Sequence, residues 1–245
     1  MFFEFPTADE WRNLQDTYPF DRLELSEDHF RYTANPQGSM ESFYAGSEIQ
    51  TWTLHLKNRL IQTRWSYIFL MFHFTNGIPD DEWFISPGKN GESIQYYPHF
   101  EQKDHLTKAQ FDYYADIFYY KLFSAWDTLG HILNVLYELG IDKPTFNEAV
   151  RKLEPVKPVL HTKLKSIIDS DDFVRMRDFR HNITHNHLPG NIGSSVRKVS
   201  PSHFTFGGGS YTPSGLVQAN VTKSLDLFAD TLAAIKGQTV IDSST

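Results

Sequence analysis

The spacing of hydrophobic and polar residues predicts helices over most of the chain, because apolar side chains return every three or four positions. Between these helices, residues 77–106 are rich in Gly, Pro and Asp, which is typical of a long loop. Alternation in His203–Phe206 predicts a small β-hairpin within residues 196–212. The expected fold is an all-α helical bundle with long loops. The predicted helices comprise residues 7–17, 47 to about 74, 107–139, 145–154, 157–170, 171 to about 187 and 213–236.

Capping residues set the expected ends of several helices. Thr7 and Glu10 have the spacing of a capping box, in which each side chain accepts a hydrogen bond from the other residue's backbone. The stretches Ser47–Gln50 and Thr107–Gln110 have the same spacing and are expected to open the two longest helices. Gly140 is expected to end the second of them.

The predicted helix 107–139 is apolar around much of its circumference, so it is expected to be central or to serve both a core and a subunit interface. Ser124, Asp127, His131 and Glu138 follow one stripe of this helix. Polar groups on a largely buried helix are either paired or functional. Residues 47–245 are expected to form one compact bundle, with residues 1–46 as an acidic segment packed on it.

The charged residues are unevenly distributed along the chain, and this bears on the expected binding partner. The 245 residues include 23 Lys and Arg and 30 Asp and Glu, a net charge of −7. Residues 1–50 contain 3 basic and 10 acidic side chains, whereas residues 151–200 contain 10 basic and 5 acidic ones. A local basic region is what phosphate binding requires, so a nucleic-acid partner remains open. The absence of cysteine excludes a disulfide scaffold, a zinc ribbon, an iron–sulfur site and a cysteine nucleophile.

The chain lacks several common motifs of nucleotide-binding proteins and hydrolases, and this narrows the classes of protein to which it could belong. The chain has no P-loop, no G-x-G-x-x-G, no H-E-x-x-H and no G-x-S-x-G. The apolar run Trp65–Phe74 is too short for a bilayer, and the first residues do not resemble a secretory signal. A soluble, cytoplasmic protein without a membrane partner is expected. Asp80–Glu82 is interpreted as a solvated acidic turn rather than a metal site.

The segment Arg175–His187 places three arginines and three histidines within thirteen residues of a predicted helix. Three interpretations compete. His181 and His185 stand one helical turn apart, as zinc ligands can, although no third ligand is nearby in the sequence. Basic residues at the end of a helix also complement its dipole and cap its carbonyls. The third interpretation is acid–base chemistry on a phosphodiester, with Arg180 holding the phosphate and a neutral histidine accepting a proton.

An Arg followed by four to six residues and a His, near the end of a helix in an all-α bundle, resembles the signature of the HEPN superfamily (higher eukaryotes and prokaryotes nucleotide-binding). Arg180 and His185 give the four-residue spacing, and Arg180 and His187 the six-residue spacing. The commonest form of the motif has a polar residue, often Asn, directly after the Arg. Here His181 takes that place and Asn182 follows it, so the two spacings leave the key histidine open.

The resemblance implies a metal-independent endoribonuclease in which a histidine helps the ribose 2′-hydroxyl attack the adjacent phosphate. Arg180 would clamp the phosphate, and His185 or His187 would be the general base. Asp127, from the central helix, would orient one of them or else be a satisfied buried polar residue, and His181 and Asn182 would support the site.

The expected partners are RNA or a nucleotide and a second copy of the chain, with a cognate antitoxin as a further candidate. No cofactor and no metal is implied. The alternative hypothesis is a non-catalytic HEPN-like module that binds a nucleotide, RNA or a protein through the same surface, because a fold does not establish an activity.

Overall fold

The computed structural model describes residues 4–26, 29–30, 32–33, 40–185, 190–194, 196–237 and 240–241. Within these ranges it describes only the backbone of Thr33, Ser42, Thr184, His185, Arg197, Val240 and Ile241. None of the helices described combines the length and the apolar character that a membrane span requires.

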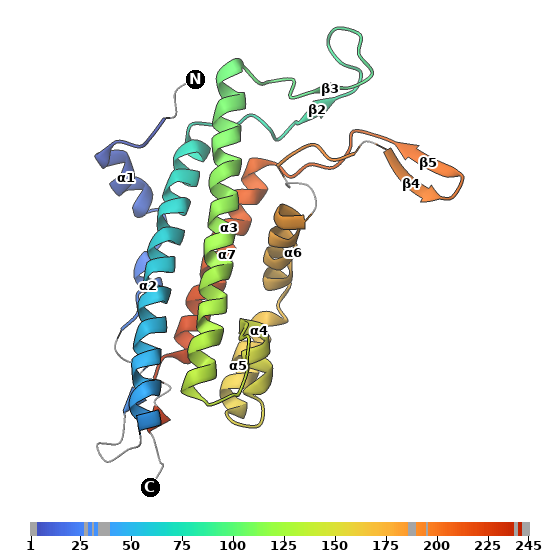
Figure 1. The fold of residues 1–245 in the computed structure, drawn as a ribbon. Coiled ribbons are helices and arrows are strands. Elements are labelled where there is room, and N and C mark those ends of the chain that lie inside the picture. Colours follow the sequence, from blue (N-terminus) through green and yellow to red (C-terminus); the bar gives the residue numbers. More distant parts are fainter. Residues whose placement is uncertain are drawn as a thin grey trace.

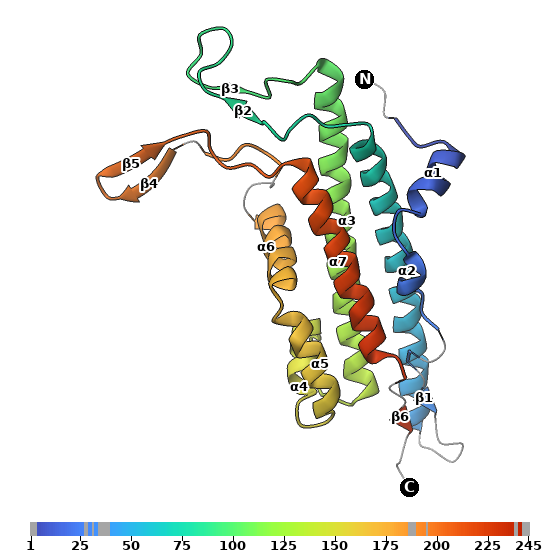
Figure 2. The ribbon, with the colours of Figure 1, turned by 180° about the vertical axis from the view of Figure 1, so that it is seen from behind.

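Two long antiparallel helices, α2 (Met40–Thr75) and α3 (Gln102–Leu136), form the frame of the molecule (Figure 1). The last helix, α7 (Ser214–Ile235), runs along the rear of this pair, as the reverse view shows (Figure 2). On the side of α3 away from α2 lie α4 (Phe146–Lys152), α5 (Pro158–Ile168) and α6 (Asp171–His185). The prediction of an all-α bundle is confirmed.

The core is centred on Trp126 of α3, which is almost fully buried. Its ring centroid lies 4.6 Å from that of Phe146 on α4, 5.3 Å from Phe173 on α6 and 4.9 Å from Phe228 on α7. One side chain thus joins four helices, and it lies directly before Asp127 in the sequence.

The short helices begin and end close to where capping residues predict. In α1 (Ala8–Gln15) the capping box of Thr7 and Glu10 is present, and Thr145 caps α4 through its side chain. The two long helices begin earlier in the chain than the sequence predicts. The helix α2 begins at Met40 rather than near Ser47, and α3 begins at Gln102 rather than near Thr107.

The ends of α3 differ from prediction because side chains of α3 near each end bind backbone groups just outside the helix. At the start, Asp104 accepts a hydrogen bond of 2.8 Å from the Glu101 backbone N–H, so the cap lies before the Thr107 signal. At the other end, α3 stops at Leu136, before Gly140. There the Asn134 side chain accepts the Ile141 N–H at 3.0 Å and donates to the Ile141 carbonyl at 3.2 Å.

The predicted hairpin near residues 196–212 is present as β4 (Val196–Ser200) and β5 (His203–Phe206), an antiparallel pair. Within the predicted loop 77–106, β2 (Phe84–Ile85) pairs with β3 (Gln95–Tyr96). The strand β1 (Tyr32–Thr33) pairs in parallel with β6 (Val240–Ile241). Two-residue strands contain too little alternation to be predicted from sequence.

The N-terminal segment packs along α2 and α7. Trp11 of α1 lies edge-on to Phe69 of α2, with 5.3 Å between ring centroids. Arg22 belongs to the short 3₁₀ helix η1 (Phe20–Leu23). Its guanidinium donates to Asp226 at 2.6 Å and to Asp230 at 3.1 Å, both on α7. The helix α2 is continuous across the expected boundary between residues 46 and 47. The expected division into an N-terminal segment (residues 1–46) and a helical bundle (residues 47–245) stays a prediction.

A buried histidine on α2 makes stability depend on pH. His73 is buried, and its ring stacks on Tyr114 of α3 with 5.6 Å between centroids. Its Nε2 has no hydrogen-bond partner among the described residues. Burial lowers the pKa of His73 from 6.5 to about 4.

We expect the free energy of unfolding to fall as the pH drops below about 6.5. Between that pH and about 4, the unfolded chain binds a proton that folded His73 does not bind, so the unfolded state is favoured. Urea unfolding at about pH 7 and about pH 4.5 should therefore show wild type losing about 2–3 kcal/mol more than His73→Phe. An equal loss in both proteins would show that His73 is not responsible.

Candidate functional site

The helix α6 carries the predicted Arg–His motif and is fixed to the core by its N-terminal half. Phe173 and Met176 are buried, and the Ser170 hydroxyl accepts the Phe173 backbone N–H at 3.2 Å. Farther along, the ring of Phe179 lies 5.7 Å from that of Tyr119 on α3. This packing makes α6 a rigid support for the side chains along its border with α3.

Arg180 lies at this border and is half-buried. Its guanidinium carbon lies 5.6 Å from the ring centroid of Phe123 on α3, which is the geometry of a cation–π contact. Arg180 therefore borders the core of the bundle rather than extending freely into water.

Asp127, one helical turn beyond Phe123, lies within the electrostatic reach of Arg180. Desolvation of its carboxylate raises the pKa of Asp127, whereas four neighbouring groups lower it: the Phe146 backbone N–H, then Arg180, His131 and Arg59. Three helices supply the three side chains among these groups, since Arg59 belongs to α2, His131 to α3 and Arg180 to α6. We call Arg59, Asp127, His131 and Arg180 the Asp127 cluster. It contains two guanidiniums and one carboxylate.

On the α2 side, His131 stacks flat on Trp52, with ring centroids 4.0 Å apart and an angle of 15° between planes. The Trp52 Nε1 donates to Glu48 at 3.4 Å. Burial lowers the pKa of His131, and Arg59 adds to this, whereas Asp127 and Glu48 oppose it. His131 is therefore mainly neutral at pH 7, so its ring can both donate and accept a hydrogen bond.

The structure thus brings together two of the residues predicted from sequence, Arg180 and Asp127. His181 and Asn182 are exposed on α6. The side chain of His185 and the whole of His187 lie outside the described residues, so their predicted role as general base stays a prediction. Among the described side chains, no group of three His, Cys, Asp or Glu is arranged to hold a metal ion.

Sequence reasoning missed the cluster residues that come from other helices. His131 stood out only as part of a polar stripe, and Arg59 gave no signal in the sequence. Asp116 was also missed. It lines a narrow cavity on α3 opposite Phe179 and Ile183 of α6, and burial raises its pKa to about 6.

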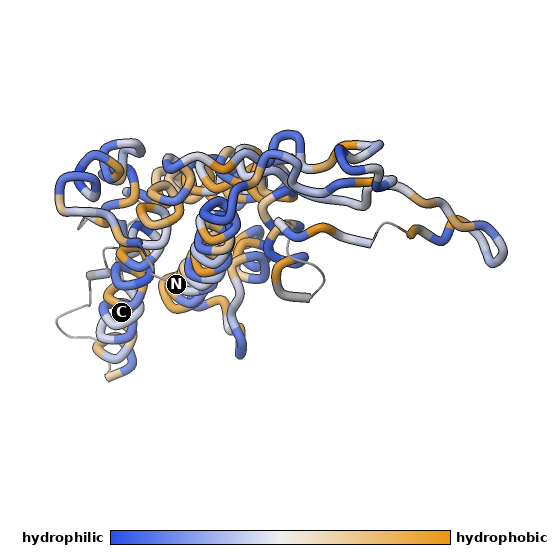
Figure 3. Tube along the Cα trace, turned by 90° about the horizontal axis from the view of Figure 1, so that it is seen from above, coloured by the Kyte–Doolittle hydropathy of each residue, from blue (hydrophilic) through white to orange (hydrophobic). Residues whose placement is uncertain are grey.

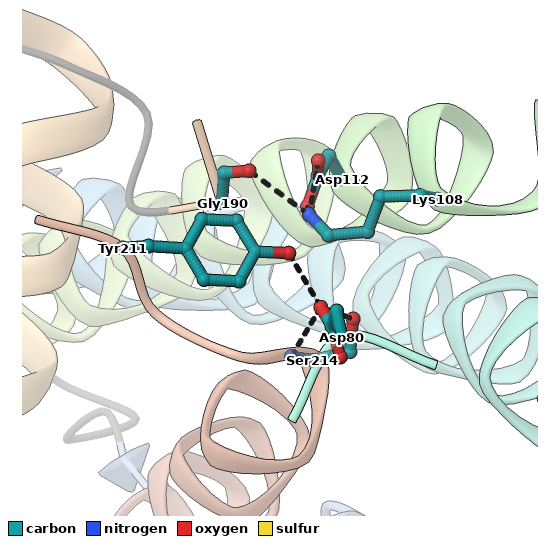
Figure 4. Close-up of polar contacts among 6 residues, drawn as sticks. All are labelled: Asp80, Lys108, Asp112, Gly190, Tyr211 and Ser214. Atoms are coloured by element: carbon teal, nitrogen blue, oxygen red, sulfur yellow. Dashed lines mark hydrogen bonds and ion pairs between the residues drawn. The ribbon is translucent and has the colours of Figure 1, made fainter. Parts of the chain in front are cut away.

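Asp80 corrects the interpretation of Asp80–Glu82 as a solvated turn. Asp81 and Glu82 are exposed, but Asp80 is buried at the start of α7. Its carboxylate accepts hydrogen bonds from the Tyr211 hydroxyl at 2.5 Å, the Ser214 N–H at 2.9 Å and the Ser214 hydroxyl at 2.6 Å (Figure 4). A carboxylate at the start of a helix also interacts favourably with the helix dipole.

A buried ion pair beside Asp80 attaches the chain after α6 to α3. The Lys108 ammonium donates to both Asp112 oxygens at 2.6 Å and to the Gly190 carbonyl at 3.1 Å (Figure 4). A Cβ on Gly190 would come within 3 Å of the Asp112 carboxylate and the Lys108 ammonium, so a larger residue here would displace this ion pair. This contact fixes where the chain goes after the motif helix.

A helical bundle with an arginine-bearing motif helix packed on a long helical hairpin defines a protein of the HEPN type. In agreement, the model of the Cthe2314-like HEPN family matches residues 52–237. The chain therefore belongs to this HEPN family. The matched range includes the whole Asp127 cluster and leaves out α1. Comparisons with curated proteins and with solved structures gave no match.

Proposed function

We propose that this HEPN protein is a metal-independent endoribonuclease whose active site includes Arg180 at the border of α3 and α6. The observation that carries the proposal is the Asp127 cluster, in which Arg180, lying over the Phe123 ring, and Arg59 are near enough to Asp127 to lower its pKa. The two guanidiniums exceed the charge of one carboxylate, and guanidinium groups bind phosphate oxygens well. The cluster therefore suits a phosphodiester, although the whole chain is acidic.

The proposed reaction is an attack of a ribose 2′-hydroxyl on the adjacent phosphorus. His185 or His187 would take the 2′-hydroxyl proton while the O2′–P bond forms and the P–O5′ bond breaks. The departing 5′ oxygen takes up a proton, and the products are a 2′,3′-cyclic phosphate and a 5′-hydroxyl. Arg180 would stabilise the charge on the non-bridging oxygens, with Asp127 orienting its guanidinium. Acid–base help from such a histidine is worth about 10²–10⁴ in rate.

The test is incubation of purified protein with labelled single-stranded RNA in excess chelator, repeated with variants at Arg180, His185 and His187. Cleavage that resists the chelator and depends on Arg180 supports the proposal. Binding of RNA without any cleavage supports the non-catalytic HEPN module instead. Cleavage that is the same in all three variants would place the activity at another site or in a contaminant.

A second copy of the chain fits the proposal, because α2 and α3 each expose large aromatic rings to solvent. Trp65 is 53 % exposed and Tyr120 68 % exposed. The ring contacts of Phe69 with Tyr114 and of Trp52 with His131 fix the register of α2 against α3, which puts Trp65 at about the height of Tyr120. Tyr120 stands seven residues from Asp127 on α3, about 10 Å along the axis. Dimerisation here would bring two Asp127 clusters near each other.

We expect Trp65→Glu and Tyr120→Glu to convert a dimer into a monomer, because each would bury a charge in the apolar interface. Light scattering coupled to size-exclusion chromatography measures the mass directly. Val159→Glu, on an exposed position of α5, is the matched control and should leave the mass unchanged. A wild-type protein that is monomeric at all concentrations, or a dimer that tolerates both substitutions, would exclude this interface.

A further inference from the structure

The hairpin β4–β5 projects from the bundle as an arm beyond the ends of α6 and α7 (Figures 1 and 3). At its base the Gly193 N–H donates to the Ser210 carbonyl at 2.7 Å, which holds the two connecting chains together. Every described side chain of β5 is exposed. A two-stranded hairpin without a covering layer is only marginally stable in water, so this arm is expected to have a binding partner.

One face of the arm combines aromatic rings with a positive charge. Val196 pairs with Phe206, and Lys198 with Phe204. Because side chains alternate along a strand and paired residues share a face, these four lie on the same side of the hairpin. Phe206 is 80 % exposed and Phe204 49 % exposed. An ammonium group on the same face as two exposed rings is suited to a ligand with both flat faces and negative charge.

The charge around the arm favours a polyanion. Residues 179–225 contain no Asp or Glu but have four basic side chains: Arg180, Arg197, Lys198 and Lys223. The other 19 basic side chains and all 30 acidic ones belong to the rest of the chain. A nucleic acid would therefore be repelled by most of this protein and attracted to this stretch, which runs from the motif helix through the arm into α7.

We propose that the β4–β5 arm binds single-stranded RNA by stacking bases on Phe204 and Phe206, with Lys198 contacting the backbone phosphate. This inference rests on the proposed function for its choice of RNA, and it adds a substrate-binding surface outside the Asp127 cluster. Stacking on aromatic side chains accepts any base, so the arm provides affinity without strict sequence preference. The arm follows α6 in the sequence and lies near one end of that helix (Figure 1), so RNA held on it would lie near the helix that carries Arg180.

The test is fluorescence anisotropy with a fluorescein-labelled oligouridine of about 20 nucleotides in which every 2′-hydroxyl is methylated. This probe is single-stranded and has no free 2′-hydroxyl to attack the phosphate, so binding is measured apart from cleavage. We expect the double variant Phe204→Ala/Phe206→Ala to bind about 10- to 100-fold more weakly than wild type, and Lys198→Glu to bind more weakly and with a smaller salt dependence.

Two controls match these variants. Phe43→Ala removes a ring that is 71 % exposed on α2, and Thr205→Ala changes the opposite face of the arm. Both should bind as wild type does. The arm contributes nothing to the buried core, so thermal unfolding of the double variant should follow that of wild type, which separates lost binding from lost folding.

The experiments distinguish failure of the arm proposal from failure of the proposed nuclease function. If the double variant binds the probe as tightly as wild type, or if wild type does not bind it, the arm proposal is wrong. It is also wrong if the double variant loses dimer mass in light scattering with unchanged RNA binding, because the arm then docks on protein. If wild type binds through the arm but cleaves no unmodified RNA in chelator, the arm proposal stands and the proposed catalytic function does not.

Discussion

Replacing Arg180 by alanine is expected to reduce chelator-resistant RNA cleavage by at least about 100-fold, which is the typical loss when one fixed donor to a developing charge is removed. The guanidinium lies over the Phe123 ring and near enough to Asp127 to lower the pKa of its carboxylate, so water cannot reproduce its position after truncation. Single-turnover cleavage of a labelled RNA at saturating protein concentration measures this loss apart from binding.

Arg177→Ala is the matched control, because Arg177 is an exposed arginine on the same helix and pairs with its neighbour Asp178 at 3.4 Å. It should cleave at the wild-type rate. Arg180→Lys keeps the charge but not the planar fork, so it should restore only part of the activity. Equal activity in wild type and Arg180→Ala would remove Arg180 from the mechanism.

The largest loss of stability is expected for Trp126→Ala, about 3–5 kcal/mol in the free energy of unfolding. The indole lies at the junction of α3, α4, α6 and α7, and its truncation leaves a cavity among Phe146, Phe173 and Phe228. Urea unfolding followed by circular dichroism measures the change.

Trp126→Phe should lose less, about 1–2 kcal/mol, because the ring contacts are partly kept. The Trp126 Nε1 has no hydrogen-bond partner among the described residues, so no such bond is lost. Phe43→Ala removes an exposed ring and should change stability by no more than about 0.5 kcal/mol. If Trp126→Ala is as stable as Phe43→Ala, Trp126 does not join the four helices.

Much of the fold could be predicted from sequence because helical periodicity and capping are local. The N-terminal half of α6 shows this well, since Met176 and Phe179 mark the buried stripe and so place Arg180 at its border. The starts of α2 and α3 could not be predicted in the same way. The Glu101–Asp104 pair caps α3 before the stronger Thr107 signal, and α2 extends back to Met40, seven residues before the predicted start at Ser47.

Only two residues of the Asp127 cluster were predicted as site residues. Arg180 belongs to the Arg–His motif, and Asp127 belongs to the polar stripe of the predicted helix 107–139. Arg180 and Asp127 come from helices that are adjacent in a bundle, and their proximity follows from the expected packing. Arg59 and Trp52 lie near the site because of the register of α2 against α3. That register cannot be predicted from any local pattern in the sequence. Asp80 was misinterpreted for a similar reason, since its burial depends on contacts with Tyr211 and Ser214 more than 130 residues away.

The chemical identity of the cleaved ends tests the central claim most directly. Mass spectrometry of the products made from an unmodified RNA in excess chelator should show 2′,3′-cyclic phosphate and 5′-hydroxyl ends with wild type and no products with Arg180→Ala. Products with 3′-hydroxyl and 5′-phosphate ends, or cyclic phosphate ends that persist in Arg180→Ala, would contradict a 2′-hydroxyl mechanism centred on Arg180.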